Sequence, residues 1–150
     1  MMARSRAVGR PAEILLVEDN LGDARLTREA LAEGRVPHRP SMLFDGLEAS
    51  EFLHRRGVFA RAPRPDLILL DLSLPKMDGR ELLANIRADE DLSSIPVIVL
   101  TASAAHEDYL RAEELAVDAY LTKPVDLERF LAVVRQMKRD WLEHLLQPAG

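Results

Sequence analysis

Short apolar runs alternate with amphipathic segments along the chain. The apolar runs predict strands over residues 14–17, 41–44, 66–71, 96–100 and 119–121. The segments that follow them carry apolar side chains at helical spacing and predict helices over 22–33, 48–55, 79–88, 107–116 and 126–146. Five strand–helix repeats are typical of a doubly wound α/β fold, in which helices cover both faces of a parallel sheet.

The apolar pattern also predicts which positions face the core. The runs at 66–71 and 96–100 do not alternate with polar residues, which indicates strands that are covered on both faces. We expect two helices to turn the following side chains inward: Ala24, Leu26, Ala30 and Leu31 from the first, and Leu47, Phe52 and Leu53 from the second. The segment 57–65, with its prolines and arginines, is expected to be an exposed connection.

Composition places the chain among soluble single domains. Its 150 residues are 47% hydrophobic and 30% charged. We expect a flexible N-terminal segment at 1–12, one domain at 13–146 and a tail at 147–150. The net charge of −5 disfavours nucleic acid as a partner, and no apolar run reaches the roughly 20 residues that cross a membrane. The absence of cysteine excludes thiolate sites and is compatible with a cytoplasmic location.

Polar residues that could bind a ligand or take part in a reaction follow the predicted strands. Glu18 and Asp19 follow the first strand, Asp71 ends the third, Thr101 follows the fourth and Lys123 follows the fifth. In doubly wound folds, ligands bind outside the carboxyl ends of the strands, so these side chains are expected to share one rim. Carboxylates without histidine or cysteine favour a hard cation such as Mg²⁺. A carboxylate can also form an acyl phosphate, which makes Asp71 the candidate nucleophile.

Each of these residues has an ordinary structural explanation when it is taken alone. An aspartate at a strand end is often a helix cap, and Thr101 and Lys123 could be a turn hydroxyl and a surface amine. Chance does not readily place all of them on one rim, so the combination favours a site. Lys123 and the Thr101 hydroxyl would then stabilise charge on a transferring phosphoryl group.

From about residue 14 to 141, the chain resembles the receiver domain of bacterial two-component response regulators. The motifs are ILLVEDN around the acidic pair, DLILLDLSLPKMDG around Asp71, VIVLTAS around Thr101 and AYLTKPVD around Lys123. The resemblance implies a flavodoxin-like sheet of order 2-1-3-4-5. It also implies a phosphoprotein switch that receives its phosphoryl group from a histidine kinase and has no separate substrate to turn over.

The family pattern carries over to individual positions. It implies that Asp71 is the phosphoacceptor and that Mg²⁺ is held by Asp19, Asp71 and the Ser73 carbonyl, with Glu18 acting through water. Thr101 and Tyr120 would form the conformational switch, and the Lys123–Pro124 bond would be cis. Tyr120 could equally be a half-buried strand aromatic.

Four segments point to a narrower group of relatives. The connection at 57–65 and the segments DLSLPKMDGRELL, IRADEDLSSIPVIVLT and RDWLEHL resemble regulators that partner bacterial phytochrome histidine kinases. This resemblance implies a role in light signalling.

Two other functional classes share parts of this pattern. Phosphatases of the haloacid-dehalogenase type also use a strand-end aspartate, but they place a second aspartate two residues later, where this chain has Ser73. Flavin-binding electron carriers share the topology, but their phosphate loop is rich in Gly, Ser and Thr. Glu18 and Asp19 would repel a phosphate there.

The last predicted helix extends further than cover for the sheet requires. A helix over 126–146 would be roughly 30 Å long at 1.5 Å per residue. Its distal apolar residues are Trp141, Leu142, Leu145 and Leu146. Exposed apolar patches commonly mark partner surfaces, so we expect a homodimer interface there. The alternative is that this tail folds back onto its own domain.

Overall fold

The computed structural model describes residues 11–33, 38–102 and 115–137. Five strands form one parallel sheet of order β2-β1-β3-β4-β5, which confirms the predicted fold class and strand order. The strands are β1 (Ala12–Val17), β2 (His38–Leu43), β3 (Leu67–Asp71), β4 (Val97–Thr101) and β5 (Ala119–Thr122). The helices are α1 (Leu21–Glu33), α2 (Gly46–Leu53), α3 (Gly79–Ala88) and α5 (Leu127–Met137), with a short 3₁₀ helix η1 (Gly57–Phe59).

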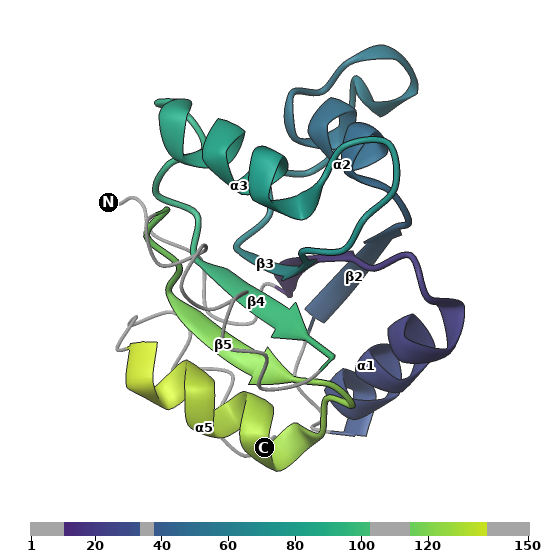
Figure 1. Ribbon diagram of the computed structural model, residues 1–150, viewed down its shortest axis with the longest axis vertical. Helices are drawn as coiled ribbons and strands as arrows, with labels where there is room; N and C mark the ends of the chain where they lie inside the picture. Colours follow the sequence, from purple (N-terminus) through teal and green to yellow (C-terminus); the bar gives the residue numbers. More distant parts are fainter. Residues whose placement is uncertain (1–10, 34–37, 103–114, 138–150) are drawn as a thin grey trace.

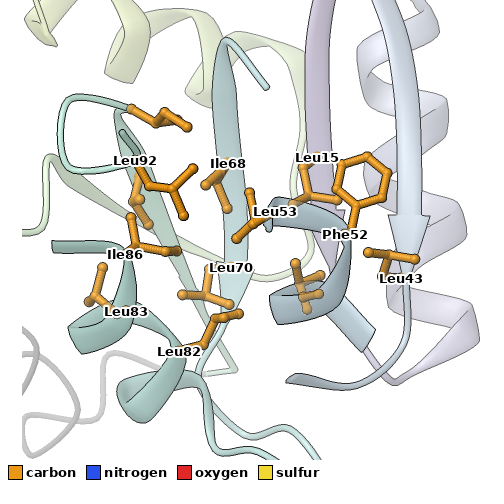
Figure 2. Close-up of a cluster of buried hydrophobic side chains, with 14 of the residues drawn as sticks. Leu15, Leu43, Phe52, Leu53, Ile68, Leu70, Leu82, Leu83, Ile86 and Leu92 are labelled. Carbon is orange, nitrogen blue, oxygen red and sulfur yellow. The ribbon is translucent and has the colours of Figure 1, made fainter. Parts of the chain in front are cut away.

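Alternate side chains of the sheet belong to two hydrophobic clusters, one on each face. Successive residues of a strand point to opposite faces of the sheet, so a continuous apolar run contributes side chains to the hydrophobic cluster on each face. Ile68 and Leu70 of β3 pack on the face covered by α2 and α3, and Leu67 and Leu69 pack on the face covered by α1 and α5 (Figure 1). Figure 2 shows the first cluster, in which leucines of α2 and α3 meet those of the sheet. All four of these β3 side chains are fully buried.

The edge strand β2 begins earlier than the sequence predicted. It starts at His38 rather than at residue 41 and pairs with β1 through Leu43. Pro40 lies within it, which an edge position tolerates because one side of an edge strand needs no ladder donors. Its exposed and half-buried residues explain why the apolar signal was weak.

Two leucines that were predicted to face inward are exposed. Leu26 is 46% exposed, because Thr27 occupies the inward position beside Ala24 and Ala30 on α1. The Thr27 hydroxyl donates to the Asp23 carbonyl at 3.0 Å, so its burial leaves no unpaired donor. Leu47 is 48% exposed at the outer side of α2.

The connection after α2 is largely exposed, as predicted, but it contains the 3₁₀ helix η1, which contacts the core. Phe59 of η1 packs edge-on against Phe52, with ring centroids 5.5 Å apart. Phe59 is partly buried against the α2–α3 side of the core, whereas Val58 beside it is exposed. The predicted helix over 107–116 and the predicted end of the last helix fall largely outside the described residues.

Two glycines allow the loop after β3 to pass close to α2 and α3. A Cβ at Gly79 would lie 2.5 Å from the Asp71 carbonyl oxygen, and one at Gly46 would lie 1.9 Å from the Met77 carbonyl oxygen. Neither contact is possible for a residue with a side chain unless backbone moves. The glycines therefore fix where the end of β3 lies relative to both helices.

We predict that Gly79→Ala lowers the free energy of unfolding by at least about 2 kcal/mol, because the added methyl group meets backbone atoms. Urea denaturation followed by circular dichroism measures this. Gly22→Ala is the matched control: its Cβ would meet only the Asn20 side chain, at 3.3 Å, so we expect a change within about 1 kcal/mol. Equal losses in the two variants would contradict the role assigned to Gly79.

Candidate functional site

The predicted strand-end residues converge on one rim of the sheet. Glu18 directly follows β1, Asp71 ends β3, Thr101 ends β4 and Lys123 directly follows β5. Because the strands are parallel, these positions meet at the same edge. All four line one pocket, to which Asp19 and Ser73 also contribute.

Three carboxylates lie close enough to share a cation. One oxygen from each of Glu18, Asp19 and Asp71 lies within 4.8 Å of the others. Glu18 is fully buried and Asp71 is 6% exposed, whereas Asp19 is exposed to solvent. An all-oxygen donor set that opens on one side suits a hard divalent cation that retains water ligands. These residues therefore fit the predicted metal.

Lys123 neutralises part of this negative charge. Its ammonium lies 2.9 Å from Glu18 Oε1, 3.0 Å from Asp71 Oδ2 and 3.1 Å from Asp23 Oδ2. Asp23 was missed in the sequence analysis. Its position in the first turn of α1, four residues after Asp19, was the available signal, because a helix that starts at this rim brings its first turn over the site.

Backbone hydrogen bonds orient the two buried carboxylates. The Ser73 N–H donates to Asp71 Oδ1 at 2.9 Å, and the Asn20 N–H donates to Glu18 Oε2 at 3.2 Å. Each carboxylate thus accepts from a backbone N–H through one oxygen and from Lys123 through the other. The site is held in place before any ligand binds.

Burial perturbs the ionisation of this cluster. It raises the pKa of Glu18 to about 7, and a hydrogen bond with Asp71 adds to the increase, while Lys123 opposes it. For Lys123, burial acts to lower the pKa, but the hydrogen bonds to Glu18 and Asp71 outweigh it and the net change is upward. Near neutral pH, the metal-free protein therefore holds Glu18 partly protonated and Lys123 charged.

The remaining predicted residues lie around this cluster. Thr101 is buried and its carbonyl accepts from the Lys123 N–H at 2.8 Å. Tyr120 is half-buried against the α2–α3 side of the core. The Lys123–Pro124 peptide bond is cis, as predicted. Trp141, Leu142, Leu145 and Leu146 lie outside the described residues.

The sequence matches the response regulator receiver domain over residues 14–135. The chain belongs to this family. It is thus a phosphoacceptor domain. Within the described ranges, no helix is long and apolar enough to cross a membrane.

Three relatives are similar over most of their length. Response regulator Rcp1 of Synechocystis sp. is 46% identical over 140 residues, which span 93% of this chain and 95% of Rcp1. Its Mn²⁺-bound crystal structure aligns with a TM-score of 0.75 over 93% of this chain and all of that one. The phosphorylated cyanobacterial phytochrome response regulator RcpA is 46% identical, with a TM-score of 0.75 over 88% of this chain and 94% of its own. The bacteriophytochrome response regulator RtBRR is 38% identical, with a TM-score of 0.79 over 86% of this chain and 79% of its own.

The chain is homologous to phytochrome-type response regulators, and membership of the family implies a histidine kinase as its partner. Receiver domains bind a divalent metal in their acidic pocket, and the similar structure of Rcp1 is of its Mn²⁺-bound form.

We predict that divalent-metal affinity falls as pH decreases below about 7, because the metal binds the deprotonated form of the raised-pKa Glu18. Calorimetric titration with Mg²⁺ between pH 5.5 and 8.5 should show affinity falling by up to about tenfold per pH unit below the pKa, with proton release on binding. Glu18→Gln should remove this slope between pH 6 and 8. A slope that persists in Glu18→Gln would assign the titration to another group.

Proposed function

We propose that Asp71 accepts the phosphoryl group and that the chain passes the signal on through protein contacts. The observation that carries the proposal is the arrangement of this carboxylate: it ends a buried strand, accepts from Ser73 and Lys123, and lies beside Glu18 and Asp19. In the transfer, a carboxylate oxygen of Asp71 forms a bond to phosphorus while the bond between phosphorus and a kinase histidine nitrogen breaks. An acyl phosphate results.

We propose Mg²⁺ as the metal. Asp19, Asp71 and the Ser73 carbonyl would hold it directly, and Glu18 would act through water. All are oxygen donors, which Mg²⁺ prefers. When bound, the metal supplies positive charge that attracts the oxygens of the phosphoryl group.

Residues of the chain complete the stabilisation of phosphoryl charge. Lys123 already contacts Asp71, so its ammonium is in reach of a group attached there. The Thr101 hydroxyl would donate to a phosphoryl oxygen, and Tyr120 on the adjacent strand β5 would move as Thr101 is drawn inward. The register pairs Thr101 with Thr122, two residues beyond Tyr120, which keeps both switch residues at the same end of the sheet.

We infer that the donor is a phytochrome-type histidine kinase. RcpA and RtBRR are both phytochrome response regulators, and they are 46% and 38% identical to this chain. The kinase identity, the cytoplasmic location and the absence of nucleic-acid binding remain predictions. A phosphatase of the haloacid-dehalogenase type is disfavoured, because Ser73 occupies the position of that family's acid and is a poor proton donor to a leaving group.

We predict that acetyl phosphate with Mg²⁺ adds one phosphoryl group, detected by intact-protein mass spectrometry, and that Asp71→Asn abolishes the labelling. Asp66→Asn is the matched control, because Asp66 precedes the opposite end of β3 and accepts from the Glu13 N–H instead of lining the pocket. It should label like the wild type. Labelling that survives in Asp71→Asn would refute the assignment of the acceptor.

We also predict a homodimer formed through the last helix and its apolar tail. The residues that would form it are Trp141, Leu142, Leu145 and Leu146. Sedimentation should show a dimer that Trp141→Ala combined with Leu145→Ala converts to monomer. A wild type that stays monomeric at tens of micromolar, with and without phosphorylation, would refute the claim and favour a tail folded onto its own domain.

A further inference from the structure

A groove of about 470 Å³ runs along the outer surface between α2 and α3, away from the acidic rim. Figure 1 shows these two helices side by side on the same face of the sheet. The residues that line the groove are Leu47, Ser50, His54 and Arg56 on the α2 side, and Met77, Asn85, Ala88 and Asp89 on the α3 side. None of them is used by the phosphoacceptor site.

One end of the groove is apolar. Leu47 is 48% exposed there, although Ala49, Phe52 and Leu53 of the same helix are turned into the core. Met77 lies at the same end and is only partly buried. α2 thus carries an apolar side chain, Leu47, that remains exposed in addition to those that it buries in the core.

The other end of the groove carries Arg56, His54 and Asp89. Arg56 is exposed, and its guanidinium forms no hydrogen bond or ion pair within residues 11–33, 38–102 and 115–137. The carboxylate of Asp89 at this end already has a partner, because its Oδ2 lies 3.2 Å from His54 Nε2. An incoming carboxylate would therefore find a cation that has no competing partner.

We propose that this groove docks a helical segment of a partner protein that carries apolar side chains at one end and acidic side chains about two turns away. Leu47 lies in the first turn of α2, and Arg56 follows the last residue of the helix, Leu53, by three residues. The eight-residue helix is roughly 12 Å long at 1.5 Å per residue. Two turns of a docked helix cover roughly 11 Å, about the length of α2 itself. The apolar end and the net charge of −5 argue against nucleic acid as the occupant.

The groove shares a wall with the loop that follows Asp71. Met77 belongs to this loop, and the Gly46 N–H donates to the Pro75 carbonyl at 3.3 Å. A bound helix would therefore contact the acceptor loop directly. The docking itself does not depend on phosphorylation, so it can be tested on the unphosphorylated protein and separately from the proposed function.

The test uses two alanine-based helical peptides titrated into ¹⁵N-labelled full-length protein. Both carry two leucines in the first half, and the last turn carries two glutamates in one peptide and two lysines in the other. We expect amide shifts from the glutamate peptide at α2, α3 and residues 75–78. The lysine peptide should bind about two- to fivefold more weakly, which is the range for partly exposed ion pairs.

Variants test whether the groove is responsible for peptide binding. Arg56→Glu should reverse the preference, so that the lysine peptide binds more tightly. Arg61→Glu, an exposed arginine outside the groove, should leave the preference unchanged. Leu47→Gln should weaken both peptides. Equal binding of the two peptides, shifts centred elsewhere, or an unchanged preference in Arg56→Glu would overturn the proposal.

Discussion

The burial of two carboxylates, those of Glu18 and Asp71, is the main electrostatic constraint at the carboxyl ends of the strands. Two negative charges that are removed from water repel strongly, and such a pair persists only when a cation or a proton joins it. Here the Lys123 ammonium lies within 3.0 Å of both, and the pKa of Glu18 is raised to about 7. The domain thus holds a cluster that is only partly neutralised, and a divalent cation would complete the balance.

The fold brings these groups together through strand order rather than through sequence proximity. Glu18 and Lys123 are 105 residues apart, yet both directly follow parallel strands and so reach the same edge. Glycine then sets the fine geometry. Gly79 allows α3 to start against the Asp71 carbonyl, and Gly46 allows α2 to start against Met77. Any movement of the acceptor loop would therefore displace the starts of both helices.

The strands and the rim residues could be predicted because continuous apolar runs and the polar residues after them are local signals. Features that depend on tertiary packing could not be predicted from the sequence. Leu26 fits a helical apolar stripe as well as Thr27 does, and only the orientation of α1 decides that Thr27 is buried. The contact between Asp23 and Lys123 depends on that same orientation. The exposure of Leu47 likewise follows from how α2 and α3 pack, which no periodicity in one helix specifies.

We expect Lys123 to stabilise the domain by neutralising the acidic cluster. The direct measurement is the free energy of unfolding of Lys123→Ala without metal at pH 6 and pH 8. Lys76→Ala is the control, because Lys76 is 66% exposed and its ammonium lies 3.5 Å from a single carboxylate, that of Asp45. We predict a loss of about 2–4 kcal/mol at pH 8, a smaller loss at pH 6, where Glu18 is protonated, and substantial recovery with Mg²⁺ at pH 8. A loss that is the same at both pH values and is unaffected by Mg²⁺ would contradict this role of Lys123.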